Sequence, residues 1–493
     1  MTTTASCTAP ASATRLEHDL LGDRHVPTHA YYGVHTLRAR ENFPITGIPI
    51  GTYPDLIHAL ACVKQAAART NAELGLLPRD IATAIEAACI EIRSGALADH
   101  FVVDVIQGGA GTSTNMNANE VIANRALELL GRDRGDYSTI HPIEHVNMSQ
   151  STNDAYPTAV KIALQFLTRR LNGAMGQLAW AFTVKAEEFA LIVKMGRTQL
   201  QDAVPMTLGQ EFATYAAMLN EDIARLGEAT TLLTEINLGG TAIGTGINTH
   251  PQYSAINCAH LREISGFDLS IAADLVEATQ DVGAFVHLSG VLKRTALKLS
   301  KVCNDLRLLS SGPQAGLSEI NLPAVQAGSS IMPGKVNPVI PEVVNQVAFE
   351  VVGNDVAISL AAEGGQLQLN AFEPIITHSL FKSILHLTNA CHTLTDNCAT
   401  GITANTDHLR AIVERSIGIA TALNPYIGYS SATKVAAEAL ETGRSITELV
   451  VEQGLLTRVQ VEEILRPEVL IPSLRRNLPT VSTHTSENRG LSR

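Results

Sequence analysis

Residues 328–338 read GSSIMPGKVNP, a run in which two adjacent serines stand between glycines and one lysine follows. Glycine frees the backbone and serine favours turns, so this stretch is expected to be a mobile loop that carries one cation. A phosphate-binding loop does not fit, because Gly328 and Gly334 are one residue too far apart for GxxxxGK and Val336 replaces the hydroxyl residue that binds magnesium. The loop is predicted to extend over residues 310–338.

Long apolar segments flank this loop. Residues 275–309 and 343–369 are apolar with few interrupting charges, and the segment after Pro157 has apolar residues at three- and four-residue spacing. Such helices exceed the length of an average globular helix and need burial on several sides. Alternating strand patterns are scarce. The sequence therefore predicts an all-α bundle whose members pack against other subunits.

Changes in texture divide the chain into three predicted domains. They are an N-terminal helical domain over 1–150, a central long-helix bundle over 151–405 and a small helical C-terminal domain over 406–493. Residues 1–14 are small and polar and lack the apolar core of a secretory signal, so a disordered tail is expected there. The Ser/Thr/Arg-rich end, beyond residue 477, is expected to fray.

The composition excludes several classes of protein. The chain has 493 residues, a net charge of −12 and no basic block that could neutralise phosphates, which argues against a nucleic-acid partner. No apolar run reaches the roughly 18 residues that a membrane helix needs. The seven cysteines are scattered, odd in number and without CxxC pairs, so neither a disulfide framework nor a zinc site is indicated. We expect a cytoplasmic protein in a reducing compartment.

Two patterns come near known ligand sites but depart from them. His141 and His145 have the spacing of zinc ligands, but Pro142 follows the first and the glutamate is displaced, so a surface turn without metal is predicted. The glycine-rich stretch 239–246 lacks the third glycine of a dinucleotide-binding fingerprint and follows a helical pattern. It is predicted to be a tight turn between helices.

Two further segments share the polar character of the loop. Residues 108–115 read GGAGTSTN and residues 149–154 read SQSTND, each with hydroxyl and amide side chains where a helix is expected to begin. Helix N-termini present free N–H groups and the positive end of the dipole, and they bind anions. Ser, Thr and Asn are also ordinary helix caps. Three such clusters in one chain favour an anion-binding site over capping alone.

Together these segments resemble the fumarase/aspartase superfamily, over residues 15–470. The loop GSSIMPGKVNP matches the signature loop of that superfamily. Six other stretches resemble it: AYYGVHTLRARENF at 30–43, GGAGTSTNMNANE at 108–120, SQSTNDAYPTA at 149–159, KMGRTQLQDAVPMTLGQEF at 194–212, GGTAIGTGIN at 239–248 and GITAN at 401–405. The resemblance implies an all-α, three-domain fold whose long central bundle is completed by homotetramerisation, with active sites that take residues from three subunits.

Within the superfamily the chain most resembles the aspartate ammonia-lyases. Ala110 and Thr152 stand where fumarases generally carry serine, and Gln199 stands where they carry a histidine that handles the leaving water. The resemblance implies reversible elimination of ammonia from L-aspartate to give fumarate, through an enediolate and without a cofactor. The alternatives are a class II fumarate hydratase, a lyase acting on a substituted aspartate, and an inactive relative such as a lens crystallin.

The resemblance also implies the roles of individual residues. Ser329 would be the general base, acting as an alkoxide whose pKa is lowered by nearby cationic charge and backbone N–H groups. The substrate-binding residues would be Thr112, Ser151, Thr152 and Ser330 at the β-carboxylate, Lys335, Asn337 and Thr198 at the α-carboxylate, and Asn153 and Gln199, with Thr112, near the amino group.

Overall fold

The computed structural model describes residues 13–471. The tail predicted over residues 1–14 lies almost wholly outside this range, and so does the fraying predicted beyond residue 477. Thr14 differs from the prediction, because it begins strand β1 (Thr14–Asp19). This strand pairs in antiparallel fashion with β2 (Gly22–Pro27).

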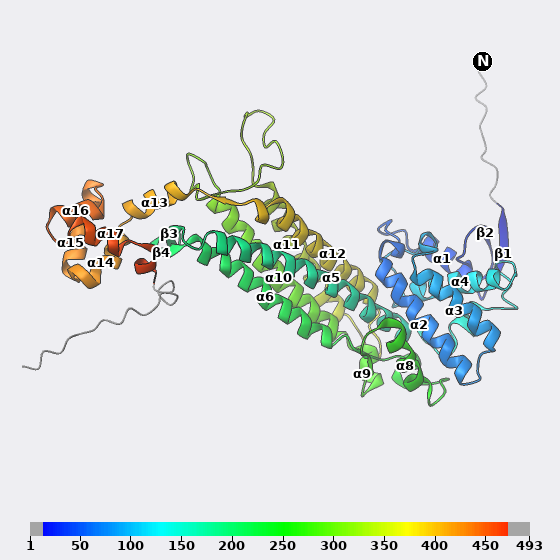
Figure 1. Cartoon of the computed structure of the whole chain (residues 1–493). Helices are drawn as coiled ribbons and strands as arrows, with labels where there is room; N and C mark the ends of the chain where they lie inside the picture. Colours follow the sequence, from blue (N-terminus) through cyan, green and yellow to red (C-terminus); the bar gives the residue numbers. More distant parts are fainter. Residues whose placement is uncertain (1–12, 472–493) are drawn as a thin grey trace, which may run out of the picture. The chain divides into compact units, whose positions relative to one another are not determined.

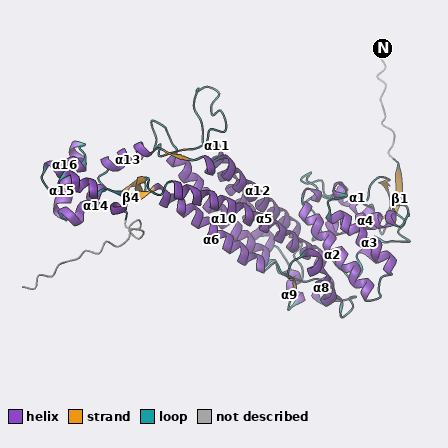
Figure 2. Ribbon diagram, viewed as in Figure 1, coloured by secondary structure: helices purple, strands orange, loops and turns teal. Residues whose placement is uncertain are grey.

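Helices make up most of the described chain, as Figure 2 shows, and the prediction of an all-α protein is confirmed. The strands form two-stranded pairs only. Besides β1 with β2, these are β3 (Val193–Thr198) with β4 (Gln201–Thr207), β5 (Glu235–Ile236) with β6 (Ser270–Ile271), and β7 (Ile320–Asn321) with β8 (Thr403–Ala404). Across residues 13–471, every helix is too short or too polar to span a lipid bilayer.

The described residues form two compact units whose segments alternate along the chain. Unit 1 contains the described part of Met1–Gly176 together with Leu219–Lys301 and Val343–His392. Unit 2 contains Gln177–Met218, Val302–Glu342 and the described part of Thr393–Arg493. The division into domains over 1–150, 151–405 and 406–493 stays a prediction.

The first part of unit 1 is built around α2 (Pro54–Glu73). Pro54 opens this helix at a position where its missing N–H is not needed, and most of the side chains that follow are buried. Packed around α2 are α3 (Arg79–Arg93), α4 (Thr112–Leu129) and α8 (Tyr253–Ser265). The short elements nearby are α1 (Val34–Asn42), α7 (Thr241–Gly244), α9 (Leu275–Gln280), 3-10 turns at Ile50–Thr52 and Ala98–His100, and a π turn at Pro142–Val146.

Parts of five long helices supply the rest of unit 1, and they run side by side in Figure 1. They are α5 (Thr152–Glu188), α6 (Leu208–Thr231), α10 (Gly283–Leu309), α11 (Val339–Glu363) and α12 (Glu373–Asn397). Buried side chains join neighbours: Ser289 of α10 donates to Asp355 of α11 at 2.7 Å, and Asn354 of α11 donates to Ser383 of α12 at 3.0 Å. The bundle of long, buried helices predicted from apolar periodicity is confirmed.

α5 begins within the polar segment 149–154, as predicted, whereas the helix predicted over 275–309 is divided in two for a local reason. α5 begins at Thr152 and contains Pro157 in its second turn, where the proline removes a single helical hydrogen bond. The helix predicted over 275–309 breaks at Asp281, whose backbone is extended and whose carboxylate accepts the Gly283 N–H at 2.9 Å. This local hydrogen bond competes with the helical one and separates α9 from α10.

The predicted loop over 310–338 is confirmed, since it connects α10 to α11 with only β7 as regular structure. α11 ends at Glu363, short of the predicted residue 369, because Gly364 and Gly365 follow and glycine disfavours a helix interior.

Unit 2 holds the β3–β4 hairpin, the long loop and a set of short helices. Those helices are α13 (Thr406–Arg415), α14 (Ile419–Ile427), α15 (Tyr429–Thr442), α16 (Ile446–Glu452), α17 (Arg458–Ile464) and α18 (Pro467–Leu470), with a 3-10 turn before them at Ala399–Gly401. Ile419, Leu423, Val435 and Leu449 form a buried apolar core with Met195 of β3, so the hairpin packs on these helices.

Candidate functional site

In unit 1, hydrogen bonds join the start of α5 to the glycine-rich turn at 239–246, which contains α7. Asp154 accepts the N–H of Ser151 at 3.0 Å and the N–H of Gly239 at 3.1 Å. Asn153 donates from its side chain to the Ala242 carbonyl at 2.7 Å. Two polar segments that are far apart in sequence therefore share one hydrogen-bonded junction. A short strand, β5, precedes this turn, whereas the sequence pattern predicts a helix directly before it.

The start of α4 lies directly against α5. Gly111 has a left-handed backbone (φ +88°), and a Cβ atom there would lie 2.6 Å from the ring of Tyr156, so only glycine permits this approach. Thr112 then begins α4, and its hydroxyl donates to a carbonyl of the preceding turn at 2.7 Å. One turn later, Asn115 donates a side-chain N–H to the Thr152 hydroxyl at 3.1 Å.

Two helix N-termini therefore meet in unit 1. The half-buried residues at this point are Thr112, Ser151, Thr152 and Asn153. α4 has 18 residues and α5 has 37, so both present free N–H groups and the positive end of a helix dipole. The prediction that these polar segments stand at helix starts is confirmed, and their arrangement suits a carboxylate.

Asp154 is the buried acidic group of this junction, with 1% of its surface exposed. Burial raises the pKa of its carboxyl to about 7, although the backbone N–H groups of Ser151 and Gly239 act in the opposite direction. Because both oxygens accept backbone N–H groups, Asp154 positions the chain and does not face a ligand.

Thr198 and Gln199 lie at the exposed tip of the β3–β4 hairpin in unit 2. Gln199 and its neighbour both have positive φ, as a two-residue hairpin turn requires. The stem is fixed by Glu319, which is fully buried and lies 2.7 Å from Lys194 Nζ and 2.5 Å from Arg197 Nη1. Glu319 directly precedes β7, so one carboxylate joins the stem of the hairpin to the long loop at this residue.

The signature loop over 328–338 closes on itself. The side chain of Asn337 donates to the Gly328 carbonyl at 2.9 Å. A Cβ atom at Gly328 would lie 2.0 Å from the carbonyl oxygen of Lys335, so glycine is required at this close approach. The two ends of the loop are therefore held together while its middle is exposed.

Ser329 lies inside this closed turn and is half-buried. Its hydroxyl oxygen accepts the N–H groups of Ile331 at 3.2 Å and Met332 at 2.9 Å. Backbone donors of this kind favour a negatively charged oxygen. Ser330 and Lys335 are exposed on the same loop, so the loop presents one hydroxyl backed by N–H donors and one exposed cation.

The ten predicted site residues fall into two groups, four in unit 1 and six in unit 2. The structure brings the four of unit 1 together at the starts of α4 and α5. In unit 2, the stem of the hairpin that carries Thr198 and Gln199 is paired with Glu319 of the long loop. Among the described hydrogen bonds, none joins the hairpin tip to residues 328–338.

The histidine pair forms a turn, as predicted. His141 Nδ1 accepts the N–H groups of Ile143 at 3.1 Å and Glu144 at 3.2 Å, and His145 Nδ1 accepts the His141 N–H at 2.8 Å. These bonds close the π turn at Pro142–Val146. Within residues 13–471, no group of three or more His, Cys, Asp or Glu side chains could hold a metal ion.

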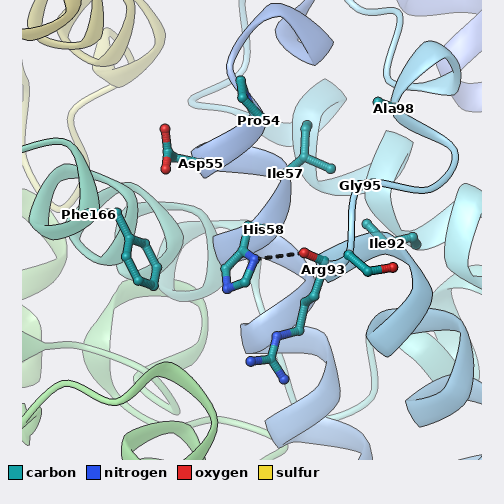
Figure 3. Close-up of a pocket in the computed structure, with 10 residues that line it drawn as sticks. Pro54, Asp55, Ile57, His58, Ile92, Arg93, Gly95, Ala98 and Phe166 are labelled. Carbon is teal, nitrogen blue, oxygen red and sulfur yellow. Dashed lines mark hydrogen bonds between the residues drawn. The ribbon is translucent and has the colours of Figure 1, made fainter. Parts of the chain in front are cut away.

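A separate cavity of about 270 Å³ lies in unit 1 among α2, α3 and α5 (Figure 3). Asp55, His58, Arg93 and Phe166 help to line it, and no predicted site residue does. His58 Nδ1 lies 3.0 Å from the Arg93 carbonyl oxygen, and the Asp55 carboxylate pairs with Arg170 at 2.5 Å. These polar groups have partners within the fold, so the cavity is a poor candidate for a dicarboxylate site.

The sequence prediction did not include the residues whose hydrogen bonds hold the site residues in place. Asn115 and Asn147 lie within or beside the polar segments, and their amide density was a usable signal. Lys64 carries a different signal, because it is the one charge in the apolar run ALACVKQAAA at 59–68. A lone charge in a helix that is otherwise buried signals a polar partner elsewhere in the fold.

Known proteins match nearly the whole chain. A family model described as "Lyase" matches residues 22–353, and one described as "Fumarase C C-terminus" matches residues 419–472. The aspartate ammonia-lyase of Pseudomonas canavaninivorans is 60% identical over 462 residues, covering 94% of this chain and 98% of that protein.

Two solved structures are also similar. The fumarate lyase:delta crystallin from Brucella melitensis bound to cobalt has a TM-score of 0.91 and 54% identity, over 95% of this chain and 100% of that one. The recombinant class II fumarase from Schistosoma mansoni has a TM-score of 0.88 and 34% identity, over 93% of this chain and 100% of that one.

With its long-helix bundle and paired polar helix starts, the chain belongs to the lyase family of the fumarase/aspartase superfamily. The resemblance drawn from its motifs is confirmed. Of the three relatives named above, the one with the highest identity is an aspartate ammonia-lyase.

Proposed function

We propose that this chain is an aspartate ammonia-lyase, which eliminates ammonia from L-aspartate to form fumarate and catalyses the reverse addition. The observation that carries the proposal is its 60% identity to an enzyme of that name over 94% of the chain, against 34% identity to a class II fumarase. The positive helix starts and the loop cation also suit a substrate with two carboxylates.

In the proposed reaction, the Ser329 alkoxide removes a proton from C3 of aspartate. The electron pair of the broken C–H bond moves into the β-carboxylate and gives an enediolate with one more negative charge. The pair then returns to form the double bond between C2 and C3, while the C2–N bond breaks and the protonated amino group takes the electron pair of that bond and leaves as neutral ammonia. The N–H groups of Ile331 and Met332, which the Ser329 oxygen accepts, support the alkoxide form.

The enediolate requires preorganised donors, which usually supply the largest catalytic term. We assign this role to the hydroxyl groups at the two helix starts and on the loop. The β-carboxylate would be bound by Thr112, Ser151, Thr152 and Ser330, the α-carboxylate by Thr198, Lys335 and Asn337, and the amino group by Asn153 and Gln199 with Thr112. The exposure of Ser330 and Lys335 in a glycine-bounded loop suits closure over bound substrate.

We also propose that the enzyme is a homotetramer. The support is an exposed apolar row on α11, in which Phe349, Val356 and Leu360 are 66%, 56% and 67% exposed. Spacings of seven and four residues place these side chains on one face, as in helices that pack against a partner helix. An exposed apolar row of this kind is typical of an interface. The six cysteines within residues 13–471 are buried, and none of the seven in the sequence stands in a CxxC pair, which supports a reducing, cytoplasmic location.

The proposal is tested by incubating the purified protein with L-aspartate and, separately, with L-malate. Fumarate has ultraviolet absorbance that both substrates lack, so one readout serves both reactions. We expect fumarate and ammonium in equal amounts from aspartate and no turnover of malate. Fumarate from malate alone would replace the proposal with a fumarate hydratase.

A further inference from the structure

Lys64 is a buried lysine on α2 whose hydrogen bonds, among residues 13–471, go to amide oxygens and to no carboxylate. It has 0% exposure, and its ammonium donates to Asn147 Oδ1 at 3.0 Å and Gln150 Oε1 at 2.9 Å. Burial lowers the pKa of Lys64 to about 7. An apolar side chain would be the stabilising choice at such a position, so the lysine calls for an explanation other than stability.

The ammonium group fixes the direction of the hydrogen bonds around it. A charged lysine only donates, and a neutral Lys64 would still have two N–H groups for Asn147 Oδ1 and Gln150 Oε1, so in either state both amides turn their oxygens toward Lys64. Their amide nitrogens point the other way: Asn147 Nδ2 donates to the Gln150 carbonyl at 3.1 Å, and Gln150 Nε2 donates to the Val146 carbonyl at 3.0 Å. The orientation of each amide is thereby set at both ends.

The same direction continues to the helix starts. Asn147 Oδ1 also accepts from Asn115 Nδ2 at 3.0 Å and from Asn119 Nδ2 at 3.1 Å. Asn115 Nδ2 donates at the same time to the Thr152 hydroxyl at 3.1 Å. The Asn115 Oδ1 atom is buried and has no hydrogen-bond partner among the described residues, so no donor holds this amide in the opposite orientation.

Thr152 stands at the end of this chain of hydrogen bonds. A threonine hydroxyl has one proton to donate and can accept from others. Because the Thr152 oxygen accepts from Asn115, the proton of the hydroxyl remains available for a ligand at the start of α5. An arrangement with the amide reversed would direct that proton back into the protein.

We infer that Lys64 is a positioning residue that, through Asn147 and Asn115, orients the Thr152 hydroxyl as a hydrogen-bond donor to the substrate carboxylate. The inference rests on the proposed function, in which Thr152 binds the β-carboxylate. Lys64 touches no substrate. It acts at the far end of this series of hydrogen bonds, where its N–H groups impose the donor direction.

A double-mutant cycle tests this coupling, with kcat/KM for aspartate measured for the wild type, Lys64→Met, Thr152→Val and the double variant. Each single change is expected to lower kcat/KM by about 10-fold or more, since residues in one network couple strongly. The double variant should lie within about 3-fold of Thr152→Val alone, because the lysine has nothing left to orient. Losses that multiply, or a Lys64→Met enzyme with wild-type kcat/KM, would overturn the inference.

Lys161→Met is the matched control. Lys161 lies on α5 and donates to the Glu235 carbonyl at 2.7 Å, away from the chain described above. Any loss of kcat/KM that Lys161→Met causes should multiply with the loss caused by Thr152→Val. If Lys64→Met does not fold, Asn147→Ser interrupts the same series of hydrogen bonds at a residue outside α2, and the same outcomes apply.

The wild-type assay distinguishes failure of this inference from failure of the proposed function. A wild-type enzyme that makes fumarate from aspartate but shows independent effects of Lys64 and Thr152 contradicts only the inference. A wild type that makes no fumarate from aspartate contradicts the proposed function, and the inference falls with it.

Discussion

The carboxylate of Asp154 accepts the backbone N–H of Gly239 at 3.1 Å, which joins the start of α5 to a turn 85 residues later in the chain. The other oxygen accepts the Ser151 N–H, so two backbone segments depend on one buried side chain. This junction holds Ser151, Thr152 and Asn153 in place, and the joint binding role that we propose for them depends on it.

Asp154→Asn tests that dependence. An amide in place of the carboxylate turns an N–H group toward Ser151 or Gly239, which leaves a buried backbone donor without an acceptor. The cost is roughly 1–3 kcal/mol, and KM for aspartate should rise because the start of α5 loosens. Denaturant unfolding and steady-state kinetics measure the two effects. An enzyme with unchanged stability and KM would show that the junction does not hold the site.

Glu319→Gln should loosen the hairpin that carries Thr198 and Gln199. The substitution removes the charge that faces Lys194 and Arg197. Lys194 keeps its ion pair with Glu211, but Arg197 loses its pairing with Glu319, and breaking a buried pair is typically destabilising by about 3–5 kcal/mol. Hydrogen exchange should therefore quicken over 193–207, with a lower kcat/KM. Glu228→Gln, at an exposed pair with Arg225, is the control and should change neither. Unaltered exchange in the hairpin would refute the role given to Glu319.

Glu373→Gln should alter the pH dependence of stability. Burial raises the pKa of Glu373 from 4.5 to about 8, so between these values the folded protein holds a proton that the unfolded chain has released. Its contribution to stability is complete below pH 4.5 and is lost as pH rises through about 8. Glutamine stays neutral, so the variant's Tm minus that of the wild type should increase as pH rises through this window.

The exposed Glu363→Gln provides the control for that experiment, and its difference in Tm should not vary with pH. A Glu373→Gln difference that is flat, or that shrinks toward alkaline pH, would contradict the assignment of a buried neutral carboxyl.

Leu360→Glu should break the proposed tetramer. This side chain is 67% exposed in the single chain and belongs to the apolar row of α11, where a buried charge without a partner is costly. Light scattering should give a tetramer for the wild type and smaller, inactive species for the variant. Val459→Glu, at a 72% exposed position on α17, should remain tetrameric. An active wild-type monomer would exclude the proposed assembly.

Periodicity and local composition predicted what depends on neighbouring residues. The long helices and the helix starts at Thr112 and Thr152 follow from such patterns, and so does the loop over 310–338. The break at Asp281 was not predicted, because one side-chain hydrogen bond outweighed an apolar pattern that continues across it. The role of Lys64 was not predicted for a different reason: its partner Asn147 is 83 residues away, and only the folded chain brings the two together.

The assignments within the serine pair rest on resemblance and on local geometry, and Ser330→Ala separates the two roles. The change removes one donor to the enediolate and leaves Ser329 with its two backbone N–H groups. Turnover should fall by less than in Ser329→Ala, while succinate inhibition weakens. A Ser330→Ala enzyme without activity, beside a Ser329→Ala enzyme with normal turnover, would exchange the two roles.

The most direct measurement is kcat for fumarate formation from L-aspartate by Ser329→Ala. Alanine leaves the glycines of the loop in place, so the folded assembly and succinate binding should persist while the base is lost. General-base catalysis typically contributes 10²–10⁴-fold, so kcat should fall by at least about 10²-fold. A Ser329→Ala enzyme that binds succinate and turns over aspartate near the wild-type rate would contradict the account.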